Sequence, residues 1–278
     1  MRVLFKLVIN KIDKRGVFMS KEGRCKGRSI VFINKKGGVA KTTTVCTIAA
    51  FLSHQGKKVL IVDCDSQANS TTRFLSDEQI KDTPSLFDLL NLSLPWSKCI
   101  AKANEYENIA ILPGSLELDD AGVVLKKVNR GLPQMALHES LRGITSYFDY
   151  IFFDCAPNTG ILNQAALVAG DCYIIPTDCT TDGLAGADVI IEMANSLNRL
   201  RKSKYLGLLV CAYEKENSKH MQEFLTHLED YKINLIQTKI PATSHIPASG
   251  NAGLTIFDTH PKHKTAKAYE QVIRSVIM

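Results

Sequence analysis

The sequence has no apolar run of the about 18 residues that a membrane-spanning helix needs. Its first 28 residues also lack the uninterrupted apolar stretch and small-residue cleavage site of a secretory signal. No two of its eight cysteines are spaced as CxxC, which argues against an iron–sulfur or zinc site. We therefore expect a cytoplasmic protein whose cysteines are reduced, small and buried.

Net basic charge is absent from most of the chain. Residues 1–28 carry nine Lys or Arg and two acids, whereas residues 29–278 carry 25 basic and 26 acidic residues. Nucleic-acid binding by residues 29–278 would therefore need local basic patches. We expect 1–28 to be a loosely ordered extension, or upstream sequence if Met19 is the natural start. A short amphipathic or DNA-contacting arm is the alternative.

Apolar segments of strand length alternate with helical segments throughout residues 29–278. They are apolar at successive positions, which is typical of strands buried on both faces of a parallel sheet. We expect one doubly wound, mostly parallel α/β sheet flanked by helices, with the ligand at the carboxyl ends of the strands. The predicted strands are 29–34, 58–63, 109–112, 149–154, 172–177, 205–213 and 234–240, and the predicted helices are 41–55, 84–91, 116–128, 134–147, 160–169, 184–200, 218–230 and 264–277.

A glycine-containing turn joins the first predicted strand to the first predicted helix, in the stretch NKKGGVAKTTT (34–44). Gly37 and Gly38 allow backbone amides to approach an anion, and the helix N-terminus adds unpaired N–H groups. Lys41 would reach the β- and γ-phosphates of a nucleotide, and the hydroxyl of Thr42 would bind Mg²⁺. The stretch therefore predicts a phosphate-binding loop.

The strict pattern GxxxxGK[ST] fails here, because its glycines would fall at Lys35 and Ala40. KKGGVAKTTT instead resembles the deviant Walker A motif of the ParA/MinD ATPases, which makes the expected fold a P-loop NTPase. In that family the first lysine, here Lys36, reaches the nucleotide of the other subunit, so the resemblance implies an ATP-dependent sandwich dimer. The residues it assigns to the nucleotide are Lys36, Gly37, Gly38, Val39, Ala40, Lys41, Thr42 and Thr43.

Ala40 stands where the family usually has glycine. Alanine is tolerated if φ is negative and no ligand atom needs the space of its Cβ, and it otherwise reduces nucleotide affinity or turnover. We expect nucleotide binding to survive.

Two further segments end in acids. VLIVDCDSQANSTT (59–72) resembles the family's DxDxQxN segment, in which Asp65 matches the acid that orients or activates the attacking water and Asp63 the acid close to Mg²⁺. DYIFFDCAPN (149–158) has the form of a Walker B strand, whose Asp154 would hold Mg²⁺. The family's first proline is replaced by Ala156. The implied catalytic residues are Lys36, Lys41 and Asp65, and the implied metal ligands are Thr42, Asp63 and Asp154.

The resemblance covers roughly residues 29–277 and is closer to short, Soj-like ParA proteins than to MinD. It implies ATP and Mg²⁺ as cofactors, a homodimer in the ATP state, a ParB-like partner and a place on the nucleoid. The end of the chain, AYEQVIRSVIM, predicts a core-packing helix, so we expect no stable membrane association. A MinD-like or other cargo-positioning ATPase, or a slow ATP-gated scaffold, stays open as an alternative.

ParA-like dimers bind DNA without sequence preference, which requires Lys and Arg at phosphate spacing. Relatives carry arginines where Ala242 and His245 stand, so two expected phosphate contacts are weak or absent. Each basic cluster alone is more typical of a solvated face than of a DNA-binding site. The candidate DNA-binding residues are Arg199, Arg201, Lys202, Lys204, Lys215, Lys262 and Lys264.

Overall fold

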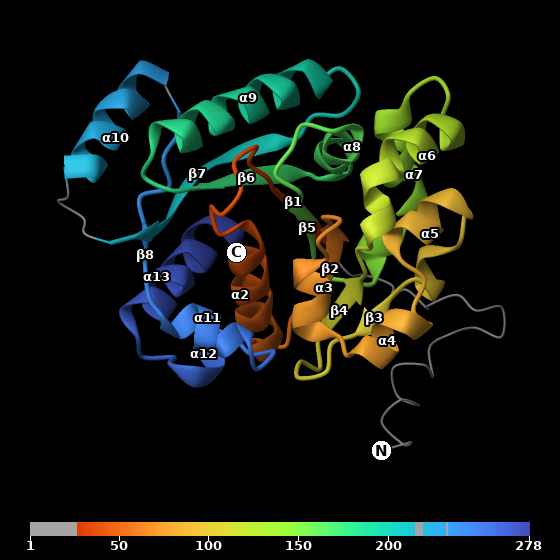
Figure 1. Cartoon of the computed structure of the whole chain (residues 1–278), viewed down its shortest axis with the longest axis horizontal. Coiled ribbons are helices and arrows are strands. Elements are labelled where there is room, and N and C mark those ends of the chain that lie inside the picture. The colour runs from red at the N-terminus through yellow and green to blue at the C-terminus, as the bar shows by residue number, and fades with distance from the viewer. Residues whose placement is uncertain (1–26, 215–218, 232) are drawn as a thin grey trace.

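The computed structural model describes residues 27–214, 219–231 and 233–278. Within these residues, one eight-stranded sheet runs in the order β3-β4-β2-β5-β1-β6-β7-β8, with helices on both faces (Figure 1). All neighbouring strands are parallel except β3 and β4. The predicted α/β fold class is confirmed. The strands are β1 (Arg28–Phe32), β2 (Val59–Cys64), β3 (Ala101–Lys102), β4 (Ile109–Leu112), β5 (Tyr150–Cys155), β6 (Cys172–Thr177), β7 (Lys204–Tyr213) and β8 (Ile240–Pro241).

Two hydrophobic clusters, one on each face, explain why the strands are apolar at successive positions. On β1, Val31 packs into the cluster formed with α5 to α10, whereas Ile30 and Phe32 pack into the one formed with α2 and α13. Alternate side chains of a strand point to opposite faces, so a strand covered on both sides has no polar face. The helices are α2 (Lys41–His54), α3 (Asn69–Phe74), α4 (Asp77–Asp82), α5 (Leu86–Asn91), α6 (Ala121–Val128), α7 (Ala136–Ser140), α8 (Ile161–Ala169), α9 (Thr181–Leu197), α10 (Lys219–Tyr231), α11 (His245–Gly250), α12 (Ile256–Thr259) and α13 (Lys264–Val272).

The chain ends as a π-helical turn, Ile273–Ile277, which continues α13. Val272, Ile273 and Ile277 are fully buried, and Val276 packs against the same cluster, as the helical spacing predicts. Of the helices that the structure describes, none combines the length and the apolar character needed to cross a membrane.

Three segments differ from prediction. The predicted strand 234–240 is wrong, because the backbone pairs with β7 at Leu235 and again only at Ile240–Pro241. The intervening 237–239 is polar and the register shifts at the end of β7. The predicted helix 134–147 is interrupted, because α7 ends at Ser140 and Gly143, with a φ of 83°, precedes a separate 3-10 turn. The first turns of 116–128 are likewise 3-10 helix rather than α-helix.

The strand order places a crevice beside β1. The connection that leaves β1 leads to β2 on one side of it, whereas the connection that leaves β5 leads to β6 on the other side of β1, so the direction of the connections reverses here. Ligands of open α/β sheets bind at the carboxyl ends of the strands at such a reversal. The loop that follows β1 therefore lies at the expected ligand position.

Candidate nucleotide-binding site

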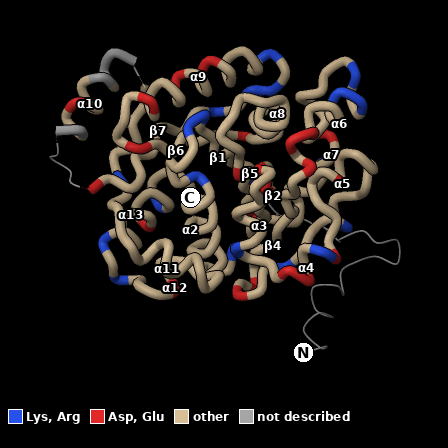
Figure 2. The backbone as a smooth tube through the Cα atoms, in the orientation of Figure 1, with Lys and Arg blue, Asp and Glu red and all other residues tan. Residues whose placement is uncertain are grey.

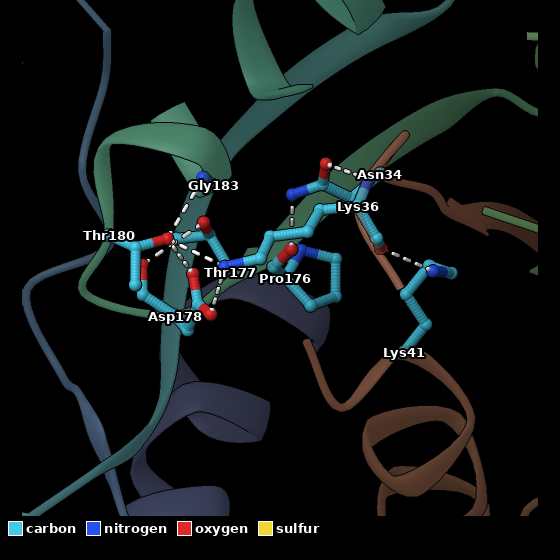
Figure 3. Close-up of polar contacts among 8 residues, drawn as sticks. All are labelled: Asn34, Lys36, Lys41, Pro176, Thr177, Asp178, Thr180 and Gly183. Carbon is cyan, nitrogen blue, oxygen red and sulfur yellow. Dashed lines mark hydrogen bonds and ion pairs between the residues drawn. The ribbon is translucent and has the colours of Figure 1, made fainter. Parts of the chain in front are cut away.

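The loop between β1 and α2 is anchored to β6 by a buried asparagine. The Nδ2 of Asn34 donates to the carbonyl oxygen of Pro176 (2.8 Å), and its Oδ1 accepts from the backbone N–H of Lys36 (3.0 Å; Figure 3). Asn34 is completely buried, and its amide is satisfied at both ends. The loop is therefore held in one shape before any ligand contact is made.

Ala40, which precedes the first residue of α2, adopts the left-handed conformation with φ 64° and ψ 29°. The negative φ that would make alanine neutral at this position is not found. An L-residue pays about 1 kcal/mol in this region because its Cβ crowds the following carbonyl. The backbone thus has the shape that glycine favours, and Ala40 holds it under strain.

Replacement of Ala40 by glycine is expected to raise the free energy of unfolding by about 1 kcal/mol and the melting temperature by about 2–4 °C. Nucleotide affinity should change by less than about tenfold, because the loop already has the required shape. Thermal unfolding and calorimetric titration with ATP measure both. Ala212→Gly, at an exposed position with φ 55°, is the matched control for backbone relief alone. A gain in affinity of several orders of magnitude would show instead that the native loop is impaired.

Lys41 is almost fully buried at the start of α2. Its Nζ donates to the carbonyl oxygen of Lys36 at 3.0 Å (Figure 3). Burial lowers the pKa of the Lys41 ammonium, and the nearby carboxylates of Asp154 and Asp65 act in the opposite direction. Such a buried cation is stabilised by an anion placed beside it.

Lys36 points away from Lys41, toward the start of α9. Its Nζ contacts Oδ2 of Asp178 (2.5 Å) and Oγ1 of Thr180 (2.7 Å), as Figure 3 shows. Thr180 also caps α9 by accepting from the N–H of Gly183 (3.1 Å). Both members of the ion pair keep about 30% of their side-chain surface exposed, 27% for Lys36 and 31% for Asp178. The two lysines of the loop therefore contact different parts of the molecule.

The acids of β2 and β5 are neighbours because the strands pair with Asp63 opposite Asp154. Asp63 is satisfied by the protein: its Oδ2 accepts from the N–H (2.9 Å) and hydroxyl (2.7 Å) of Thr71, and its Oδ1 from the N–H of Asp65 (3.2 Å). Asp63 therefore orders the loop that carries Asp65, while its predicted place near Mg²⁺ stays a prediction.

Asp154 is buried in a different way. Neither carboxylate oxygen has a hydrogen-bond partner among the described residues. Burial, followed by the charge of Asp63, raises the pKa of Asp154 to about 8, and the nearby hydroxyl of Thr42 and then the charge of Lys41 oppose this rise. A buried carboxylate without partners is costly unless a cation compensates it. Carboxylate and hydroxyl oxygens are ligands that Mg²⁺ prefers, so Asp154, together with Thr42, fits such an ion.

A cavity of about 770 Å³ opens in front of these groups. That volume suits a ligand of nucleotide size. Its walls are formed by Gly37, Gly38 and 40–43 of the loop, by residues between Asp65 and Arg73, by Pro157 and by the turn Gly250–Asn251. The structure thus brings most of the predicted site residues to one cavity. Val39 is buried, and Lys36, Asp63 and Asp154 are not part of the wall.

The sequence interpretation missed Arg73, Gly250 and Asn251 on this wall. Gly250 and Asn251 are about 180 residues away from Arg73 along the chain, and no motif connects them. Arg73 lies in the short helix α3, which follows the DxDxQ segment. The composition of that helix carries no signal that its arginine faces the cavity.

The predicted DNA-binding residues that the structure describes form two groups, which lie at opposite ends of the parallel strands. Arg199, Lys202 and Lys204 are exposed at the connection from α9 to β7, at the amino ends of the parallel strands. Lys262 and Lys264 are exposed beside the start of α13, which contacts β8 at the carboxyl ends. In Figure 2 the basic segment beyond the end of α9 lies well apart from α13. Lys215 lies outside the described residues.

Arg201 has a role within the fold. Its Nη1 donates to the carbonyl oxygens of Val168 (2.9 Å), Ala169 (3.0 Å) and Gly170 (2.8 Å), and its Nη2 pairs with Asp171. These carbonyls end α8, so Arg201 caps that helix. Its donors are therefore largely used inside the protein.

Comparison with known proteins finds one matching family model and relatives that align with most of the chain. A family model described as an AAA domain matches residues 27–206. The chain is 34% identical over 244 residues to the chromosome partitioning protein ParA of Myxococcus xanthus, covering 85% of this chain and 83% of that protein. It is 27% identical over 252 residues to the sporulation initiation inhibitor protein Soj of Bacillus subtilis, covering 90% and 98%.

Solved structures share the fold. One is the cobyrinic acid a,c-diamide synthase of Mycobacterium smegmatis with bound ADP and magnesium, with TM-score 0.76, 28% identity and coverage of 90% of this chain and 94% of that one. Another is a plasmid partition protein of Borrelia burgdorferi bound to AMPPNP, with TM-score 0.74, 19% identity and coverage of 90% and 98%. At 19% identity the second likeness concerns the fold alone.

Proposed function

Because this chain belongs to the ParA/Soj family of P-loop partitioning ATPases, we propose that it is a Mg²⁺-dependent ATPase whose ATP-bound form is a homodimer. Its cargo would be plasmid or chromosomal DNA on the nucleoid, and its partner a ParB-like protein. The observation that carries the proposal is the unpartnered carboxylate of Asp154, whose charge acts on Lys41, a buried lysine that lines the cavity.

The proposed roles follow from this arrangement. The backbone amides of the loop and the ammonium of Lys41 would bind the phosphates, and Thr42 and Asp154 would hold Mg²⁺. A bound Mg²⁺ would neutralise charge on the phosphate oxygens. Asp65 orients the attacking water. Such catalysis depends on positioning and electrostatic stabilisation, and needs no covalent intermediate with the protein.

The loop is proposed to be of the deviant Walker A type, in which Lys36 serves the nucleotide of the partner subunit. In this structure Lys36 is held by Asp178 and Thr180 of its own subunit. Reaching across an interface therefore requires the contact with Asp178 to break. This pair would oppose dimerisation by the strength of a partly exposed ion pair, about 1 kcal/mol or less.

Replacement of Asp178 by asparagine is expected to lower the ATP concentration at which half of the protein is dimeric, by about two- to fivefold. Sedimentation at increasing ATP measures this midpoint. Asp182→Asn is the matched control, because Asp182 is an exposed acid in the first turn of the same helix. A midpoint that is equal in wild type and both variants would show that the Lys36–Asp178 pair does not restrain the dimer.

DNA binding is proposed to require ATP and to weaken steeply between about 50 and 300 mM salt, because cations released from the phosphates drive it. The two basic groups predict different surfaces. We expect the double variant Lys262→Ala/Lys264→Ala to bind random duplex DNA more weakly than the double variant Arg199→Ala/Lys202→Ala. The reason is that Lys262 and Lys264 lie at the carboxyl ends of the strands, where the proposed nucleotide site is. Arg201 is left out of the surface because it caps α8.

The whole proposal is tested by measuring ATP hydrolysis with and without DNA and the protein encoded by the neighbouring gene. Turnover that rises only when both are present supports a partitioning ATPase. ATP-dependent dimerisation without stimulated turnover supports the slow, ATP-gated scaffold instead. DNA binding that does not need ATP would contradict the proposal.

A further inference from the structure

We propose that Arg73 is an additional nucleotide-binding residue, whose guanidinium contacts the phosphate chain of a nucleotide in the cavity. This inference rests on the proposed function, because it assigns a further ligand contact to the same site. It adds a second cation, from α3, to the one that the loop supplies through Lys41.

Arg73 lies where such a contact could be made. It is in the last turn of α3, partly buried, and lines the same cavity as Lys41 and Thr43. The positive charge of Arg73 acts on side chains of two other helices. Burial raises the pKa of the Cys46 thiol in α2 and of the Tyr269 phenol in α13, and the charge of Arg73 opposes both rises. The position of Arg73 on the cavity wall is therefore close to α2, whose first residues line the same cavity.

Few N–H donors of the Arg73 guanidinium form hydrogen bonds within the described part of the protein. Its hydrogen bond to the carbonyl oxygen of Leu254 is long, at 3.4 Å, and no described carboxylate lies within ion-pair distance. Arg201 and Arg274, by contrast, each pair with an acid. A guanidinium has five N–H donors, so most of those on Arg73 are available to a ligand.

The absence of a side chain at Gly250 leaves room for the Arg73 guanidinium on the cavity wall. A Cβ added at Gly250 would come within 2.4 Å of Nη2 of Arg73, so only glycine lets the group lie directly against this turn. The turn Gly250–Asn251 and α3 therefore hold Arg73 between them. This contact fixes the guanidinium without using its donors.

The chemistry of the wall favours phosphate as the group that Arg73 contacts. Among the described residues lining the cavity, Lys41 and Arg73 are the cations, Asp65 is the acid and aromatic side chains are absent. A planar guanidinium binds phosphate oxygens through paired N–H groups. A bound triphosphate would thus meet one cation at the loop and another at α3.

The test compares ligand affinities of wild type and Arg73→Gln, which keeps much of the side-chain length but removes the charge. Calorimetric titrations use Mg²⁺ with ATP, with ADP and with inorganic tripolyphosphate. Loss of a charge-assisted contact should weaken all three by a similar factor of about 10 to 100. Arg73→Lys should recover part of the loss. Arg130→Ala, which removes an exposed arginine outside the cavity, should bind as wild type does.

Two results would overturn the inference. Affinities of Arg73→Gln equal to those of wild type would show that Arg73 only braces α3 against the Gly250 turn, and a lower melting temperature would then be its sole effect. Loss confined to ATP and ADP, with tripolyphosphate unaffected, would place Arg73 at the nucleoside. If wild type itself bound no ATP, the proposed function would fail rather than this assignment.

Discussion

Replacement of Asp65 by asparagine is expected to reduce ATP hydrolysis by about 100-fold or more while ATP affinity stays within a few fold. Asp65 lines the cavity and is only 8% exposed. Its Oδ1 accepts from the N–H of Gln67 at 3.0 Å, which fixes the carboxylate and leaves the other oxygen for a water molecule. Proton transfer by a positioned carboxylate contributes about 10²- to 10⁴-fold to a rate, and asparagine cannot accept the proton.

Single-turnover hydrolysis and equilibrium ATP binding separate these two effects. Asp77→Asn is a suitable control, since Asp77 is an exposed acid in the next helix. If Asp65→Asn hydrolysed ATP at more than about half of the wild-type rate, another group would have to activate the water.

Replacement of Asp154 by asparagine is expected to have opposite effects on stability and activity. The pKa of Asp154 is raised to about 8 from an ordinary 3.8. Between these values the folded protein binds a proton that the unfolded chain has released, so the free energy of unfolding falls as pH rises. Asparagine removes this penalty. Without Mg²⁺, the melting temperature of the variant relative to wild type should therefore increase from about pH 5 to about pH 8.

The activity of Asp154→Asn should fall by about 100-fold or more, because the proposed ligand for Mg²⁺ is lost. Thermal unfolding at the two pH values and the Mg²⁺ dependence of hydrolysis measure the two effects. Asp63→Asn is the matched comparison and should lower stability, since Asp63 accepts three hydrogen bonds that one amide oxygen cannot replace. An Asp154→Asn variant with unchanged Mg²⁺ dependence would refute the role of Asp154 as a metal ligand.

Much of the fold follows from local sequence. Runs such as SIVFI and YIFFD are apolar at successive positions, and both form central strands covered on two faces. The loop is predictable too, since its glycines and Lys41 lie between a strand and a helix. The run 234–240 is also predicted as a strand but pairs with β7 only near its two ends, because 237–239 is polar and an edge strand depends on its neighbour's register as well as on its composition.

Other features depend on contacts between distant parts of the chain. The pair between Lys36 and Asp178 joins residues 142 positions apart, and Arg73 meets a turn near residue 250. Arg201 looks like a surface cation in the basic stretch NRLRKSK, yet it caps α8. The positive φ of Ala40 is likewise set by the loop, whereas the residue type alone favours a negative value. Tertiary packing decides each of these.

The central claim is that Lys41 serves the nucleotide of its own subunit and Lys36 that of the partner. Sedimentation of wild type and Lys36→Gln with Mg²⁺ and a non-hydrolysable ATP analogue tests it most directly. Wild type is expected to become a dimer, while Lys36→Gln is expected to bind the analogue and stay a monomer. A Lys36→Gln variant that dimerised with the analogue as wild type does would contradict the two-lysine mechanism.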